Sequence, residues 1–76
     1  MIKENDLKSL KTFWIGEDGH YCDGWEFSII PRNLKRTDWD LYDFNEVNGN
    51  VKFIKQLKDI EDLYETYYLL TLKELE

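Results

Sequence analysis

Turn-forming residues occur so often along most of this chain that only short strands fit between them. Three Asp-Gly or Asn-Gly pairs, which strongly favour tight turns, lie at residues 18–19, 23–24 and 48–49. The single proline, Pro31, lacks the N–H that a strand inside a sheet must donate, so it marks the end of a strand. A chain divided in this way is expected to form short antiparallel strands joined by turns.

The first two strands are predicted on either side of residues 17–24. Residues 12–16 (TFWIG) are β-branched or aromatic and suit a pleated surface. Residues 25–30 (WEFSII) alternate, and the apolar positions on one face are Trp25, Phe27 and Ile29. The pattern predicts one hairpin across residues 12–30, with the glycine-rich stretch as its loop.

A second hairpin is predicted after a basic loop, residues 31–37. Its strands are residues 43–47 and 51–56, which flank the Asn-Gly turn. Strict alternation in the later strand would place Phe53 and Lys55 on the same face.

The C-terminal segment carries the clearest helical pattern, over residues 60–70 and extending to 75. Asp59 can cap this helix, and the acids just after it lie where the helix dipole favours negative charge. The residues of its predicted buried face follow helical spacing: Ile60, Leu63, Tyr64, Tyr67, Leu70 and Thr71. Residues 66–72 (TYYLLTL) would also suit a strand, and the sequence leaves that alternative open.

A short helix is also predicted near the N-terminus, over residues 5–11, with Asn5 or Asp6 as its cap. The predicted fold class is α+β. It is a small two-layer domain with an antiparallel sheet of about four strands, in two hairpins, packed against a C-terminal helix.

Size and composition predict a single domain, residues 1–76, whose core depends on aromatic side chains. The chain has 3 Trp, 5 Tyr and 4 Phe, and each can bury about 150–250 Å². Cys22 is the only cysteine, which excludes an internal disulfide and favours a reducing, cytoplasmic location. The charged N-terminal stretch resembles neither a signal peptide nor a membrane span, so no membrane association is expected.

The net charge of −6 is concentrated in the second half of the chain. Residues 1–37 balance six acids with six bases, whereas residues 38–76 carry ten acids and four bases. Such a field repels nucleic acid and anionic membranes and attracts basic partners. Solubility is the simpler explanation for a charge of this size. The basic loop could touch a nucleic-acid backbone, but the negative field around it opposes direct nucleic-acid binding.

No pattern in the sequence points to catalysis, a metal or a cofactor. His20 and Cys22 are one histidine and one cysteine, whereas a structural zinc site needs four such ligands. Neighbouring acids such as Asp23 should raise the pKa of a thiol rather than activate it. The glycine spacings match no phosphate-binding loop. We therefore expect that the protein is not an enzyme. A metal or enzyme role for His20 and Cys22 is kept as an alternative.

The acidic segment from residue 38 to residue 46 is the strongest functional candidate in the sequence. It interleaves acids with aromatic residues and contains no base. The predicted partner-binding residues are Asp38, Trp39, Asp40, Tyr42, Asp43 and Glu46. Acids would steer a basic partner and aromatic residues would anchor it. The alternative is an edge strand that its charges keep soluble.

These features predict a small acidic protein-interaction module that binds a basic surface of a nucleic-acid-handling protein, in the manner of a nucleic-acid mimic. The Lys-, Ile-, Asn-, Tyr- and Glu-rich composition suggests an inhibitor or regulator from a phage or mobile element. The alternative is a structural or assembly subunit that oligomerises through its C-terminal helix, for example as a homodimer. Apolar residues that leave the predicted buried face of that helix would make the contact: Tyr68, Leu69, Leu72 and Leu75.

Overall fold

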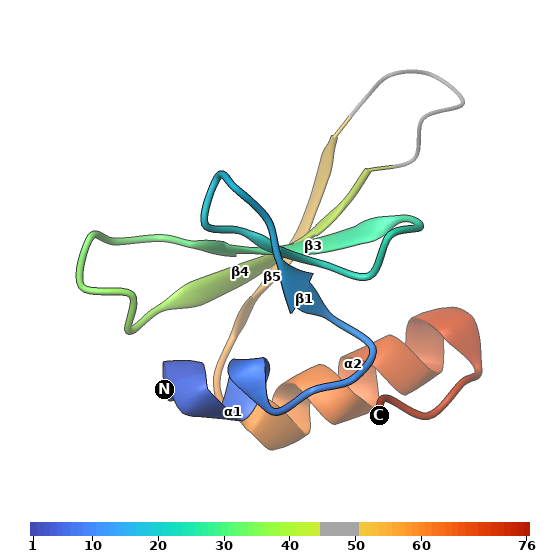
Figure 1. Cartoon of the computed structure of the whole chain (residues 1–76). Helices are drawn as coiled ribbons and strands as arrows, with labels where there is room; N and C mark the ends of the chain where they lie inside the picture. Colours follow the sequence, from blue (N-terminus) through green and yellow to red (C-terminus); the bar gives the residue numbers. More distant parts are fainter. Residues whose placement is uncertain (45–50) are drawn as a thin grey trace.

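The computed structural model describes residues 1–44 and 51–76, which form an antiparallel sheet with two helices on one side (Figure 1). The elements in chain order are α1 (Glu4–Lys8), β1 (Trp14–Ile15), β2 (Tyr21–Cys22), β3 (Phe27–Pro31), β4 (Trp39–Asp43), β5 (Lys52–Leu57) and α2 (Ile60–Thr71). The strand order in the 5-stranded sheet follows the sequence, β1-β2-β3-β4-β5, and every pair is antiparallel. The predicted α+β class with a C-terminal helix on the sheet is confirmed.

The prediction of about four strands is wrong by one, because residues 17–24 are not a single loop. Gly19 and Gly24 both adopt positive φ, 81° and 78°, so the chain reverses twice within this stretch. Between the two reversals Tyr21 and Cys22 pair with β1 on one side and with β3 on the other. Two consecutive Asp-Gly turns therefore enclose a two-residue strand.

The second turn also displaces Trp25 from the predicted strand. The carboxylate of Asp23 accepts backbone N–H bonds from Trp25, Glu26 and Phe27, so β3 begins only at Phe27. Phe27 and Ile29 are buried as predicted, whereas Trp25 is 89% exposed. The predicted stop is confirmed, since Pro31 is the last residue of β3.

Strand β4 lies inside the sheet, between β3 and β5, which excludes the interpretation of its acids as protection for an edge strand. It starts at Trp39, earlier than the predicted strand 43–47, and the predicted turn at 48–50 falls outside the described residues. The pairing of β4 with β5 shifts register between Leu41 and Tyr42.

This irregularity separates two residues that were predicted to share a face. Phe53 packs edge-on against Tyr42, with ring centroids 5.5 Å apart. Lys55 instead reaches Asp62 of α2, with its Nζ 2.7 Å from a carboxylate oxygen. The extra residue in β5 therefore lets it present an aromatic group to the open face and a charge to the helix.

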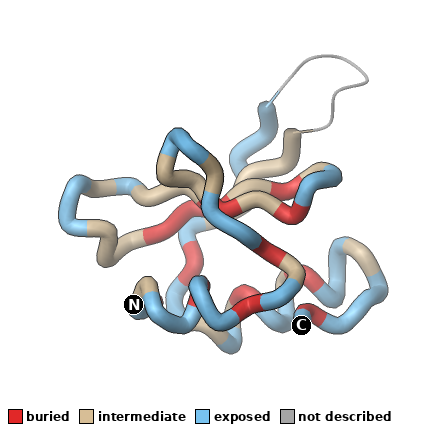
Figure 2. Tube along the Cα trace, in the orientation of Figure 1, coloured by how far each residue is buried: buried red, intermediate tan, exposed pale blue. Residues whose placement is uncertain are grey.

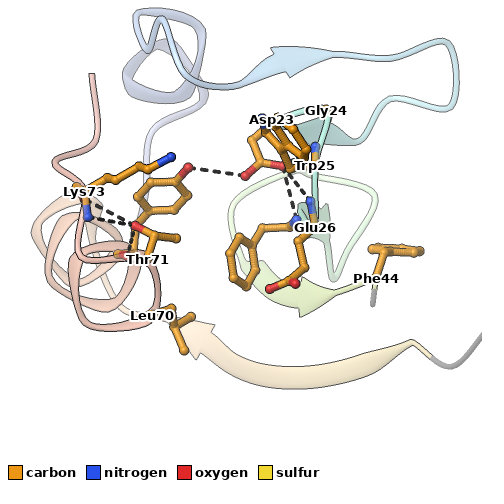
Figure 3. Close-up of a pocket in the computed structure, with 10 residues that line it drawn as sticks. Asp23, Gly24, Trp25, Glu26, Phe44, Leu70, Thr71 and Lys73 are labelled. Atoms are coloured by element: carbon orange, nitrogen blue, oxygen red, sulfur yellow. Dashed lines mark hydrogen bonds between the residues drawn. The ribbon is translucent and has the colours of Figure 1, made fainter. Parts of the chain in front are cut away.

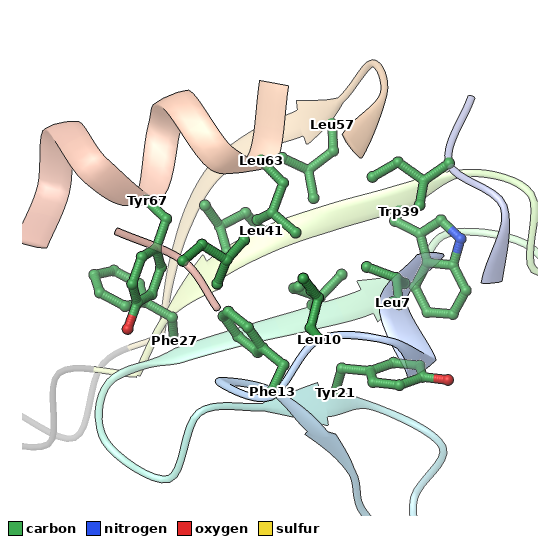
Figure 4. Close-up of a cluster of buried hydrophobic side chains, with 13 residues drawn as sticks. Leu7, Leu10, Phe13, Tyr21, Phe27, Trp39, Leu41, Leu57, Leu63 and Tyr67 are labelled. Carbon is green, nitrogen blue, oxygen red and sulfur yellow. The ribbon is translucent and has the colours of Figure 1, made fainter. Parts of the chain in front are cut away.

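The core fills the space between the helices and the sheet (Figure 4), and Figure 2 shows the buried residues gathered on that side. Trp39 is fully buried, and its ring meets Tyr21 edge-on at 5.6 Å. Tyr67 of α2 makes edge-on contacts with Phe13 and Phe27, at 5.6 and 5.8 Å. Each such pair contributes about 0.5–1.5 kcal/mol beyond burial, so aromatic residues supply much of the core, as the composition suggested.

Both helices differ from prediction mainly at their ends. Helix α2 is capped by Asp59, whose side chain accepts the N–H of Asp62, and it continues to Thr71. The alternative of a strand over residues 66–72 is thereby excluded. Helix α1 starts at Glu4, and its N-cap position is Lys3, which makes no side-chain capping bond. The predicted caps for α1 are therefore wrong.

Candidate functional site

The two residues at the start of β4 that were predicted to bind a partner are occupied inside the protein. Trp39 is 0% exposed and belongs to the core. Asp40 faces the open side of the sheet, but Arg32 covers it, with Nε at 3.0 and 3.1 Å from the two carboxylate oxygens. A buried ring and a neutralised carboxylate cannot anchor or steer a partner, so the surface role of these two residues is wrong.

The other predicted residues of this segment are scattered. Tyr42 and Asp43 are half-buried within the sheet. Asp38 accepts a hydrogen bond from the side chain of Asn33 at 3.1 Å in the β3–β4 connection. Glu46 lies outside the described residues. The described residues therefore do not form a continuous acidic stripe in β4.

Both arginines of the basic loop, residues 31–37, are engaged in contacts within the protein. Arg36 donates to both carboxylate oxygens of Glu4, each at 2.9 Å, and to the carbonyl of Gly19 at 2.8 Å. Its guanidinium lies 4.9 Å from the centroid of the Trp39 ring. The hydrogen bonds from Arg36 lower the pKa of Glu4 from its ordinary value. With Arg32 paired to Asp40, the loop joins α1 and the sheet and does not form a free basic patch.

Within the described residues, the contacts that His20 and Cys22 make are with other residues. His20 Nδ1 lies 3.2 Å from Asp18 in the β1–β2 turn. Cys22 is half-buried in β2, paired with Trp14 and Ser28 across the sheet. Within residues 1–44 and 51–76, no group of three or more His, Cys, Asp or Glu residues is arranged to hold a metal ion.

A hollow of about 660 Å³ lies between the β2–β3 turn and the C-terminal end of α2 (Figure 3). Trp25, Phe44 and Leu70 contribute apolar walls, and Lys73 lies at its rim. The carboxylate of Asp23 in this hollow is held by the backbone of its own turn and by the hydroxyl of Tyr67 at 3.3 Å. Its polar atoms thus fasten the turn to the helix.

The open face of the sheet, opposite the helices, carries a cross-strand row of uncharged side chains, three of them aromatic. The cross-strand register aligns Trp14, Cys22, Ser28, Tyr42 and Phe53. The charges beside this row are the paired Arg32 and Asp40, with Arg32 lying 6.0 Å from the Phe53 ring centroid. This face is apolar and electrically balanced, so it accounts for little of the negative field.

The negative field lies on α2 and the residues that follow it. Residues 59–76 carry six acids and one base, which is a net −5 of the chain's −6. Within α2 itself there is no base. The exposed side chains of α2 and its C-cap are acidic or apolar: Glu61, Tyr64, Glu65, Tyr68, Leu69, Leu70 and Leu72. We call this set the α2 face.

The α2 face contains three of the four predicted oligomer contacts. Leu69 and Leu72 are 76% and 77% exposed, and Tyr68 is 49% exposed. Leu75 is buried in the core, so it is not available for an intermolecular contact, and its prediction is wrong.

Two residues that were predicted on the buried face of the helix also belong to the α2 face. Tyr64 is 42% exposed and Leu70 is 47% exposed. For Tyr64, the spacing of four residues from Tyr68 was the available signal that both lie on one side.

No protein family matches the chain, and no curated protein and no solved structure matches it either. Within the described part of the chain, no helix is both long and apolar enough to cross a membrane.

Proposed function

We propose that this protein is a protein-interaction module that binds a basic surface of another protein through the α2 face. One observation carries the proposal: every exposed side chain of α2 and its C-cap is acidic, apolar or aromatic, and none is basic. Acids steer a positively charged partner during encounter, and exposed aromatic and leucine side chains supply the buried contact. We therefore propose that the acids of α2, and not those of β4, attract the basic partner.

A partner of opposite charge fits this face better than a second copy does. In a contact between two α2 faces, neither copy would bring a base to offset Glu61 and Glu65 of the other copy. Like charges placed across an interface are strongly unfavourable. A regulator or inhibitor that occupies the basic groove of a nucleic-acid-handling protein, as a nucleic-acid mimic, is the form of the proposal that uses these charges most fully.

The backbone at the end of α2 gives independent support. Leu72 adopts the left-handed conformation, with φ 59°, at a position where glycine is preferred. An L-residue there costs roughly 1–2 kcal/mol, and its side chain is 77% exposed. A strained and exposed leucine contributes little to the fold, whereas it would contribute to a contact with another molecule.

An assembly subunit that contributes no catalysis is the second candidate. The exposure of Leu69 and Leu72 favours it, because apolar side chains at one helix end are typical of subunit contacts. The two candidates differ in the salt dependence of binding, since charge steering is screened within roughly 8–10 Å at physiological ionic strength.

The deciding experiment is capture from a bacterial lysate by the tagged protein, followed by quantitative mass spectrometry. The test variant is Glu61→Lys/Glu65→Lys. The matched control is Asp6→Lys/Glu17→Lys, which changes the net charge equally at exposed acids away from α2. Basic proteins should be retained by the wild type and by the control, lost from the α2 variant, and released at high salt. Equal retention by all three proteins would refute the proposal.

A further inference from the structure

A slot of about 420 Å³ lies between α2 and the chain that follows it. Its five lining residues are Tyr64, Glu65, Tyr68, Glu74 and Leu75. The two tyrosines are 42% and 49% exposed, both glutamates are exposed, and Leu75 is buried. The slot therefore combines aromatic rings and an apolar side chain with two exposed carboxylates.

The reversal of the chain after α2 builds this slot. Leu72 donates its N–H to the carbonyl of Tyr68 at 2.7 Å and turns the chain back along the helix. Glu76 then fixes the returning segment: its carbonyl accepts the N–H groups of Lys11 and Thr12, at 2.6 and 2.8 Å, and its own N–H donates to the Thr12 hydroxyl at 2.9 Å. Because Leu75 is buried between these anchors, Glu74 is held beside the helix.

The chemistry of the slot selects a cation. Tyrosine faces attract cations through the ring quadrupole, and carboxylates accept charge-assisted hydrogen bonds. None of the five lining residues is basic. Lys73, the base closest in sequence, lines the hollow beside Trp25 instead. The slot therefore offers negative charge and aromatic surface that no residue lining it neutralises.

We propose that this slot binds the side chain of an arginine presented by the basic partner. This inference rests on the proposed function and names the group that the α2 face recognises. Arginine fits better than lysine because its planar guanidinium stacks on aromatic rings and its fork of donors can serve two carboxylates at once. Its aliphatic stem would lie along the edges of the two tyrosine rings, as long cationic side chains commonly do on apolar surfaces.

The test is a titration of the full chain with a small-molecule probe, monitored through the backbone amide chemical shifts by NMR. The probe is N-acetyl-arginine methylamide. Its neutral analogue is N-acetyl-citrulline methylamide, and sodium chloride keeps the ionic strength constant. Arginine should shift the amides of the five slot residues in a saturable way, and citrulline should bind about tenfold more weakly, since the cation–π contact and the ion pairs each contribute less than a factor of ten and together reach about that value. Equal shifts with both probes would overturn the inference.

Variants distinguish binding in the slot from nonspecific attraction of arginine to an acidic protein. Glu65→Gln/Glu74→Gln should weaken arginine binding by about tenfold, whereas Glu61→Gln, on the same helix but outside the slot, should leave it unchanged. Equal weakening by both variants, or arginine shifts that are as large around Asp6 and Glu17 as in the slot, would show diffuse attraction and overturn the inference.

The outcomes also distinguish this inference from the function on which it rests. If lysate capture depends on Glu61 and Glu65 but citrulline binds as well as arginine, the α2 face binds a basic partner without an arginine slot, and only the inference fails. If arginine saturates the slot but capture ignores the α2 charges, the slot stands and the proposed function fails. Self-association that Glu65→Gln/Glu74→Gln abolishes would identify a second copy as the occupant and overturn the partner assigned here.

Discussion

Removing the carboxylate of Asp23 should destabilise this protein more than any other single change at a turn. Its Oδ1 accepts the N–H groups of Trp25, Glu26 and Phe27, at 2.9, 3.2 and 3.2 Å, and its Oδ2 accepts the Tyr67 hydroxyl at 3.3 Å. Asp23→Ala would leave all four donors without their acceptor.

The size of the effect follows from which donors water can reach. The bonds to the Phe27 amide and the Tyr67 hydroxyl are buried, whereas the other two are partly buried. A buried donor without a partner costs about 1–3 kcal/mol, so two of them predict a loss of about 2–6 kcal/mol. Total stability for a chain of this length is roughly 4–11 kcal/mol. The variant should therefore lose about half of its stability.

The assay is urea denaturation followed by aromatic fluorescence, with the slope of unfolding free energy against urea as a check on the two-state assumption. Asp18→Ala is the matched control, because Asp18 begins the other Asp-Gly turn and its contacts with the amide and the Nδ1 atom of His20 are exposed to solvent. That variant should lose less than about 1 kcal/mol. Asp23→Asn, which keeps one carbonyl acceptor for the backbone, should fall between the two. Equal losses for Asp23→Ala and Asp18→Ala would refute the argument from burial.

Two further predictions concern an ion pair and a helix end. Because Arg36 lowers the folded-state pKa of Glu4, the stabilisation is present above the unfolded pKa of about 4.3 and is lost as pH falls through the lower folded value. The urea midpoint of the wild type should therefore fall more steeply between about pH 6 and about pH 3 than that of Glu4→Gln, and parallel profiles would contradict this. Leu72→Gly should raise stability by about 0.5–1 kcal/mol, or roughly 2–8 °C in Tm, because it relieves the left-handed strain, and should weaken partner capture. A lower Tm would refute the strain argument.

Local sequence signals correctly predicted the elements that depend mainly on neighbouring residues in the chain. The helix over 60–70 was predicted from a capping aspartate and a helical apolar spacing, and α2 has both. The turns were predicted from Asp-Gly pairs, but whether residues 17–24 hold one reversal or two depends on strand pairing. Strand β2 was therefore missed, because two residues carry too little pattern to identify a strand.

The acidic segment was misjudged because its surroundings are set by distant residues. Trp39 and Asp40 alternate as an exposed strand would, yet pairing on both sides places β4 inside the sheet. The β3–β4 register puts Ile30 opposite Asp40. Arg32, two residues after Ile30, is therefore close enough for its side chain to reach Asp40. Local alternation predicts which residues share a face. It does not predict which face the helices cover or where an arginine from the preceding turn will lie.

Ion pairs within the fold explain why the unneutralised acids are concentrated on the α2 face. Among the described lysines and arginines, Arg32, Arg36 and Lys55 contact acids inside the fold, and each neutralises one carboxylate. Lys55 takes Asp62 on the sheet-facing side of α2, so the acids on the outward side, Glu61 and Glu65, are not part of that contact. The outer surface of a helix that merely covered a sheet would ordinarily carry charges of both signs, interspersed. This one instead surrounds exposed tyrosines and leucines with carboxylates, an arrangement that favours a partner carrying the opposite charge.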